Sequence, residues 1–271
     1  MTGLALRKIG WFFLRDLSIA RSYRVMFVFE LIETLLGVAS FYYLSRFIEV
    51  PAFGQTQVAG GYFAFAVVGF AFFDYLTVAL NAFDQSLEEA RRNGTLEYLL
   101  VTQTSLPVIL VGSAIYPFVL LSLRTTAYLG WAVVLFQFPV GQANWAGAIL
   151  VLGASVLAFM GLGVLSASYS ILFKRGNPVK WLFVGVAGLV SGIMYPVTVL
   201  PPALQSLARL VPVTYSLEGM RAALLQQASI LALLPTLRAL LLFALVLLPL
   251  SLAVFSWALR RTKVTGTLTH F

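Results

Sequence analysis

Long apolar runs alternate with short polar connections along almost the whole chain. Six runs are long enough to cross a bilayer as helices, which takes about 20 residues. They cover residues 25–45, 61–83, 107–136, 145–173, 181–199 and 239–259. None shows the period-two alternation of a membrane β-barrel strand. The pattern therefore predicts an all-α integral membrane protein with six transmembrane helices, forming a single domain over residues 1–271.

Residues 4–22 precede the first run and show a helical period instead. Apolar residues recur at intervals of three and four, and they are Leu6, Ile9, Phe13, Leu17 and Ala20. Basic residues such as Arg7, Lys8 and Arg15 fall on the other side. This pattern predicts a basic amphipathic helix lying in the membrane interface. The alternative is an N-terminal extension of the first span.

Prolines interrupt residues 200–235, before the last apolar run. Pro201, Pro202, Pro212 and Pro235 divide this stretch into pieces too short to span a bilayer. Two short helices fit, and short helices at a membrane are tolerated where protein or water covers their ends. We expect a broken, re-entrant helical pair at the outer surface. It carries the charged residues Arg209, Glu218 and Arg221.

Residues 87–102 contain the highest density of charged residues in the chain, and we call this stretch the charged segment. Its charged residues are Glu88, Glu89, Arg91, Arg92 and Glu97. A segment of this charge must lie in water between two spans. It is therefore either a plain loop or a docking device.

Short-range patterns in the charged segment predict two helices that meet at Gly94. Asn93-Gly94 is typical of a helix C-terminus, and Thr95 is a good N-cap for a new short helix. On that helix, Leu96, Leu99 and Leu100 share one face at positions i, i+3 and i+4. An apolar face in a cytoplasmic loop needs a cover, which is either the membrane surface or a groove on a partner protein.

The composition supports the membrane class and limits the chemistry. The chain is 60% hydrophobic and 10% charged, whereas soluble domains are about 25% charged. The net charge of +8 fits basic cytoplasmic loops better than a nucleic-acid partner. Placing both termini and the charged segment in the cytoplasm puts most of the 18 Lys and Arg residues there. With no cysteine and His270 as the one histidine, a His/Cys metal site is excluded.

Four ionisable residues lie inside predicted spans, where they usually face protein or water. Glu30 and Glu33 are one turn apart in the first span, and they either reach the cytoplasmic surface or have a function. Asp74 and Arg124 lie in the second and third spans. We expect these two to pair, which requires the second helix to continue past Asp84. An ion- or proton-coupled carrier using Asp74 and Arg124 remains an alternative, as does a membrane scaffold without transport activity.

Sequence motifs of catalysis are missing from the chain. No G-x-x-x-x-G-K-[ST] phosphate loop, H-E-x-x-H zinc motif or G-x-S-x-G nucleophile elbow occurs. We therefore expect no enzyme activity, no catalytic residues and no cofactor in this chain.

Two strings of residues carry a family resemblance. One is Arg-Arg-Asn-Gly-Thr-Leu-Glu-Tyr-Leu-Leu at residues 91–100, followed by Thr-Gln-Thr-Ser-Leu-Pro. The other is the proline-rich segment from Tyr195 to Arg221. With six spans and an interfacial N-terminal helix, the chain resembles the permease subunit of ABC-2 type ABC transporters. Gln103 stands where many relatives have proline.

The resemblance implies a partner ATPase, export and dimerisation. Two cytoplasmic ATPase subunits, which hold the ATP and Mg²⁺, would dock on a coupling helix near residues 95–102. A second permease chain would complete a homodimer or a heterodimer, with a homodimer preferred. The first span of one protomer would contact the fifth span of the other, where Gly188 and Gly192 form a G-x-x-x-G pattern. The complex would export an amphiphilic small molecule or lipid across the plasma (inner) membrane, or alternatively a lipid-linked glycan.

Overall fold

The computed structural model describes residues 7, 10–11, 13–18, 24–47, 61–92, 106–139, 141, 143–173 and 177–264. The helices in these ranges are α2 (Arg24–Phe47), α4 (Gly61–Arg92), α6 (Leu106–Phe136), α7 (Trp145–Phe173), α8 (Pro178–Val190), the 3-10 helix η1 (Val197–Val199), α9 (Pro202–Ala208), α10 (Pro212–Leu225) and α11 (Ile230–Val264). The regular elements of the described ranges are all helices, which confirms the predicted all-α class for this part of the chain.

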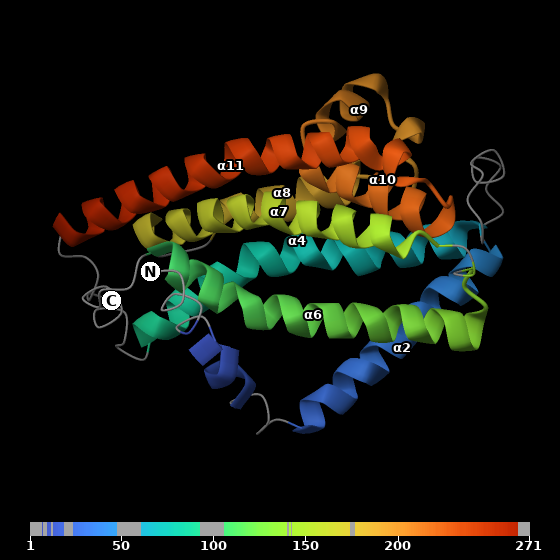
Figure 1. Ribbon diagram of the computed structural model, residues 1–271, viewed down its shortest axis with the longest axis horizontal. Helices are drawn as coiled ribbons and strands as arrows, with labels where there is room; N and C mark the ends of the chain where they lie inside the picture. The colour runs from blue at the N-terminus through green and yellow to red at the C-terminus, as the bar shows by residue number, and fades with distance from the viewer. Residues whose placement is uncertain are drawn as a thin grey trace.

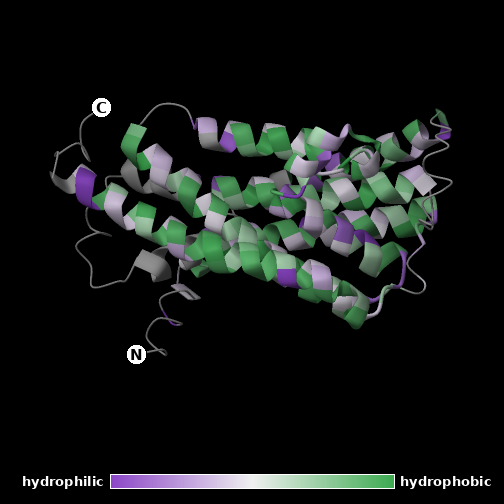
Figure 2. Ribbon diagram, turned by 90° about the horizontal axis from the view of Figure 1, so that it is seen from above, coloured by the Kyte–Doolittle hydropathy of each residue, from purple (hydrophilic) through white to green (hydrophobic). Residues whose placement is uncertain are grey.

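The long helices form a bundle with α7 at its centre. Figure 1 shows α4, α6, α7 and α11 running side by side, with α2 crossing beneath them at an angle and α9 and α10 gathered at one end. The C-terminal ends of α4 and α11 lie at the opposite end of the bundle from α9 and α10. Hydrophobic residues cover most of each long helix (Figure 2). Such helices suit a lipid environment, in which every backbone group must be bonded internally.

Glycines of α7 allow its two neighbours to approach closely. A side chain at Gly163 would overlap the carbonyl oxygen of Ala79 on α4. A Cβ atom at Gly161 would lie 2.7 Å from Leu247 on α11. Glycine therefore allows close packing of α7 at Gly161 and Gly163. At Gly153 the space beside the helix is open instead.

Five helices in the described ranges are long and apolar enough to cross a membrane. They cover Phe27–Phe47, Gly61–Gln85, Ala114–Phe136, Trp145–Phe173 and Ile230–Thr262. The predicted span 181–199 is not one helix, because α8 has 13 residues and ends at Val190. A helix of that length reaches about 20 Å, short of the hydrocarbon core of about 30 Å. The count of six spans is therefore not confirmed.

Helix boundaries follow the predictions closely in the middle of the chain and less closely at the end. α7 covers residues 145–173 as predicted, and α4 continues past Asp84 to Arg92. α11 begins at Ile230 rather than residue 239, so Pro235 lies inside the helix instead of before it. Ser229 explains this start, because its hydroxyl accepts a hydrogen bond from the Ala232 amide at 3.3 Å. This is the geometry of an N-cap.

The N-terminal segment is helical at each position where it is described, which are residues 7, 10–11 and 13–18. The ring of Phe13 lies 6.1 Å from the ring of Tyr116, so this helix contacts α6. Its position in the membrane interface stays a prediction.

Candidate functional site

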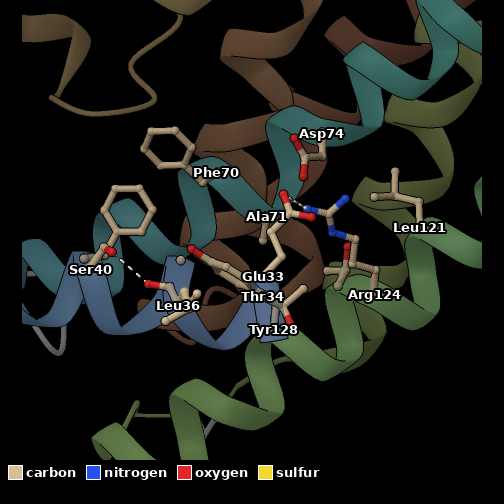
Figure 3. A pocket seen from close by; sticks show the side chains of 13 residues that line it. Glu33, Thr34, Leu36, Ser40, Phe70, Ala71, Asp74, Leu121, Arg124 and Tyr128 are labelled. Carbon is tan, nitrogen blue, oxygen red and sulfur yellow. Dashed lines mark hydrogen bonds and ion pairs between the residues drawn. The ribbon is translucent and has the colours of Figure 1, made fainter. Parts of the chain in front are cut away.

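A cavity of about 350 Å³ lies between α2, α4 and α6. Each helix contributes one charged side chain to its lining, namely Glu33 from α2, Asp74 from α4 and Arg124 from α6. Asp74 and Arg124 both lie near the midpoints of their spans. Figure 3 shows the three side chains gathered at one side of the cavity, with Phe70 and Ser40 at the other.

Arg124 forms its ion pair with Glu33. The Nη2 atom of Arg124 lies 3.1 Å from Oε1 of Glu33, and the two side chains are 35% and 67% exposed. Among the described residues, no hydrogen bond or ion pair joins Arg124 to Asp74. The expected Asp74–Arg124 ion pair is therefore replaced by one across α2 and α6. The reason is that α2 packs against both α4 and α6, which brings Glu33 beside Arg124.

Two polar groups of the cavity have no hydrogen-bond partner within the described part of the chain. The half-buried carboxylate of Asp74 is in neither a hydrogen bond nor an ion pair, and the buried hydroxyl of Tyr128 is also unpaired. A Cβ atom at Gly37 would lie 3.4 Å from the Tyr128 ring, so this glycine lets α6 approach α2 there. Buried polar groups are normally hydrogen-bonded. Because the Asp74 carboxylate and the Tyr128 hydroxyl lack such partners, this cavity is a candidate binding site.

Glu30 does not belong to this cavity. It lies one turn before Glu33 on α2, is half-buried, and is not among the residues that line the space. Of the four intramembrane charges expected from the sequence, the structure therefore brings three together and leaves Glu30 apart.

Asn177 joins three helices at the end of the bundle where α4 ends. Its Oδ1 atom accepts a hydrogen bond from the Lys180 amide at 3.0 Å, which caps α8. Its Nδ2 atom donates to Ser166 Oγ at 2.8 Å and to Ser170 Oγ at 3.0 Å, both on α7. It also lies 3.4 Å from Oδ2 of Asp84 on α4. Asn177 thus fixes the last turns of α4 against α7 and α8.

The charged segment is described only in part. Glu88, Glu89, Arg91 and Arg92 lie in the last turns of α4, whose backbone is described as far as Arg92. Gly94, Thr95, Leu96 and Glu97 lie outside the described residues, as does the expected coupling helix.

Arg221 of α10 is buried at the opposite end of the bundle. Its guanidinium donates to the carbonyl oxygens of Gly192 at 2.7 Å, Ile193 at 2.9 Å and Phe65 at 3.1 Å. It also lies 3.4 Å from the centre of the Phe65 ring. A side chain at Gly69 would overlap the guanidinium, so that glycine makes room for it. Burial lowers the pKa of Arg221 to about 9, which leaves it charged at neutral pH.

The other two charges expected in the outer segment do not join Arg221. Arg209 and Glu218 are exposed, and no ion pair connects them to Arg221 in the described ranges. The role of Arg221 is therefore to hold the surrounding backbone together, and the three charged residues do not form one site.

Gly188 and Gly192 do not share a helix face. Gly188 lies on α8 with open space beside it, whereas Gly192 comes after the end of α8 and has a φ of +77°. A Cβ atom at Gly192 would lie 2.9 Å from Cγ2 of Val197. The spacing G-x-x-x-G predicts a common face only within a continuous helix, and α8 ends between the two glycines. Whether Gly188 contacts a second copy stays a prediction.

The comparison with known protein families decides the class of this chain. The family described as ABC-2 type transporter matches residues 11–225. The chain belongs to the ABC-2 type transporter family. This confirms the resemblance found in the sequence. The matched range contains all three helices that line the cavity.

Curated relatives of this ABC-2 family member include bacterial permeases. The inner membrane transport permease YadH of Escherichia coli K12 is 26% identical over 163 residues, which are 59% of this chain and 62% of the relative. YadH proteins of Escherichia coli O157:H7 and Shigella flexneri match equally. The aligned part thus spans less than two thirds of the relatives' own length.

Sequence reasoning missed two functional candidates in this ABC-2 protein. Asn177 does have a signal in the sequence, because an Asn-Pro pair before an apolar run is typical of an N-cap with proline at the first helical position. Tyr128 carries no sequence pattern that separates it from other membrane tyrosines. Its unpaired hydroxyl becomes visible only when α2 and α6 are packed together.

Proposed function

We propose that this chain is the permease subunit of an ABC transporter in the plasma (inner) membrane, driven by a separate ATPase. The observation that carries the proposal is the family match over residues 11–225, which includes α2, α4, α6 and α7 of the bundle and the charged segment. The name of the YadH relatives, inner membrane transport permease, supports the same role and location.

The continuity of α4 supports coupling between the charged segment and the cavity. One helix runs without interruption from Asp74 to Arg92, a distance of about 27 Å at a rise of roughly 1.5 Å per residue. Asn177 holds the last part of that helix against α7 and α8. Two ATPase subunits, which carry the ATP and Mg²⁺, would push on the charged segment. α4 would transmit this movement to the cavity as a rigid helix.

An exposed face of α8 supports a second permease copy. Trp181, Leu182 and Leu189 are exposed on this helix, and Gly185 and Gly188 have open space beside them. Small residues let two membrane helices pack closely. We propose that this face contacts α2 of the second copy in a homodimer, because α2 also exposes large apolar residues such as Phe29 and Leu36.

The lining of the cavity supports an amphiphilic substrate. Charged groups occupy one side and apolar residues such as Phe41, Phe70 and Leu121 the other. We propose export of an amphiphilic small molecule or lipid, with a lipid-linked glycan as the alternative substrate. A second candidate function is an ion- or proton-coupled carrier, which the unpaired Asp74 beside the Arg124–Glu33 pair favours.

Co-expression with candidate ATPases of the same genome tests the proposal. We expect an ATPase to co-purify with the chain and reconstituted vesicles to show ATP-dependent export. Leu96→Asp and Glu97→Arg should abolish both co-purification and export, while the control Arg238→Glu, an exposed charge reversal on α11, should preserve both. A proton-coupled carrier would instead transport without any ATPase and respond to a pH gradient. Full ATPase binding and export by both charged-segment variants would contradict docking at this segment.

A further inference from the structure

The charges around the cavity leave one carboxylate without an ion pair of its own. Among the described residues that line it, Glu33 and Asp74 are acidic and Arg124 is basic, and the ion pair of Arg124 is with Glu33. The lining is therefore formally negative by one unit. A lone carboxylate near the middle of a membrane span is unfavourable without a partner. The site consequently favours a ligand that brings a positive charge.

The position of the free carboxylate shows where that charge would lie. Figure 3 places Asp74 on α4 beside the Arg124–Glu33 pair, with its carboxylate turned toward the cavity side that α6 and α2 also border. Tyr128, on α6, lines the same space and has a buried hydroxyl without a partner among the described residues. A carboxylate and a hydroxyl oxygen are both acceptors for the N–H groups of an ammonium ion.

The remaining walls suit an apolar body attached to such a cation. Phe41 and Phe70 line the cavity with ring centres 4.3 Å apart, and Leu36 and Leu121 complete the apolar part. Aromatic rings add attraction for a cation near their faces. The exposure of the Glu33 side chain shows that the cavity opens at the surface of the chain. An elongated ligand could therefore place its head inside and its tail outside.

We propose that this cavity binds the ammonium head of an amphiphilic amine, with Asp74 as the counter-charge and Tyr128 as a neutral hydrogen-bond acceptor. The inference names a substrate class for the proposed permease and rests on that function for its role in transport, although binding itself needs no ATPase. The Arg124–Glu33 ion pair carries no net charge and forms part of the cavity wall. An anionic ligand is disfavoured, because it would compete with Glu33 for Arg124 and lie close to Asp74.

Binding to the purified full chain tests the proposal. Native mass spectrometry would compare dodecylamine, dodecanol and dodecanoate, which share a chain length and differ in the charge of the head. Alkylamines are protonated at neutral pH because their pKa lies near that of lysine, about 10. We expect one dodecylamine per chain, bound at least about tenfold more tightly than the alcohol. Preferential binding of dodecanoate would overturn the proposal.

Three variants separate the residues involved. Asp74→Asn should reduce dodecylamine binding to the level of dodecanol, whereas the matched control Glu30→Gln, a carboxylate outside the cavity, should bind as the natural chain does. Tyr128→Phe should weaken amine binding and leave dodecanol binding unchanged. Gel filtration and circular dichroism in detergent establish that each variant is folded. Equal amine binding by a folded Asp74→Asn variant would refute the assignment of Asp74.

Two further measurements identify the source of the amine and separate this inference from the proposed function. Lipid extracted from the purified chain should contain phosphatidylethanolamine that is lost in Asp74→Asn if the ligand is a membrane lipid. If no such lipid is retained and soluble amines bind, the ligand is a drug-like amine. If the natural chain binds no amine but still co-purifies with an ATPase, this inference alone would be overturned. Absence of any ATPase partner with intact amine binding would overturn the proposed function alone.

Discussion

The guanidinium of Arg221 donates a hydrogen bond of 2.7 Å to the carbonyl oxygen of Gly192, 29 residues earlier in the chain. This contact lies where α8 has just ended and the backbone turns. Buried backbone carbonyl groups that belong to no helix or strand also need hydrogen-bond partners. Arg221 supplies them for Gly192 and Ile193, and it thereby joins the end of α8 to α4 through Phe65.

Replacement of Arg221 should destabilise the folded chain strongly. Arg221→Met removes the donor for three buried carbonyl oxygens, and each buried acceptor left unpaired costs about 1–3 kcal/mol. Arg221→Lys should be less harmful than the methionine, but it cannot reproduce the planar array of donors. Thermal unfolding in detergent measures the effect. The exposed Arg209→Met is the matched control and should change stability by no more than about 0.5 kcal/mol. Equal melting temperatures of Arg221→Met and Arg209→Met would contradict the structural role of Arg221.

The two glycines of the fifth apolar run should respond in opposite ways to alanine. Gly192 has a φ of +77°, so Gly192→Ala should lower stability by about 1–2 kcal/mol. Gly188 lies in α8 with open space beside it, so Gly188→Ala should leave the protomer as stable or raise its stability by up to about 1 kcal/mol. Thermal melts compare the two, and crosslinking then reports the dimer content of Gly188→Leu. A destabilised Gly188→Ala protomer would show that α8 packs differently.

Exchanging the charges of Glu33 and Arg124 should restore what either single reversal destroys. Arg124→Glu places three carboxylates around one cavity and should reduce the amount of folded chain recovered from membranes. Adding Glu33→Arg recreates an ion pair of opposite polarity and should rescue recovery. Combining Arg124→Glu with Glu30→Arg adds the same charge outside the cavity and should fail to rescue. Similar recovery from the two double variants, measured by gel filtration, would mean that net charge alone matters.

Asn177 should be required for coupling at the end of α4. Asn177→Asp keeps the acceptor that caps α8 but loses the donors to Ser166 and Ser170, and it places a second carboxylate near Asp84. We therefore expect Asn177→Asp to be more damaging than Asn177→Ala for ATP-dependent transport by the reconstituted complex. Substrate binding by the isolated chain should persist in both. A fully active Asn177→Asp variant would exclude the proposed coupling role.

Cysteine labelling tests the orientation of the chain with a clean background, because the sequence contains no cysteine. Cysteines introduced at Gln55 and Gln142 should react with a membrane-impermeant reagent from outside. Those at Asn93 and His270 should react only after the membrane is opened. Reaction of the Asn93 variant from outside would reverse the proposed orientation.

The sequence predicted the long helices well because lipid imposes a simple condition on them. A span must be apolar for its whole length, so the limits of α7 at Trp145 and Phe173 can be read from hydropathy and the flanking turn residues. The depth of a charge along its helix follows in the same way. Asp74 and Arg124 were expected to meet only if the second helix continued past Asp84. α4 does continue to Arg92, and both residues line one cavity.

Contacts around a helix axis could not be predicted in this way. Depth does not specify which neighbour a side chain faces, and Arg124 meets Glu33 because α2 crosses beside α6. The predicted common face of Gly188 and Gly192 was wrong because α8 ends at Val190, between the two glycines. The backbone beyond that end is bonded to Arg221, which comes from a later segment of the chain and gives no signal in the local sequence. The charged segment beyond Arg92 lies outside the described residues, so its expected coupling helix stays a prediction.

The contact of Gly163 with the backbone at Ala79 also limits how the molecule can change shape. Where a backbone rests directly on a backbone, the two helices cannot slide by a fraction of a turn without a collision. With Gly161 against Leu247 on the other side, we expect α4, α7 and α11 to move together as one rigid unit. α2 has most of its apolar surface exposed and lies across this unit. Of the three helices that line the cavity, α2 is therefore the least restrained by its neighbours, and we expect any change in the shape of the cavity to come from a shift of α2 relative to this unit.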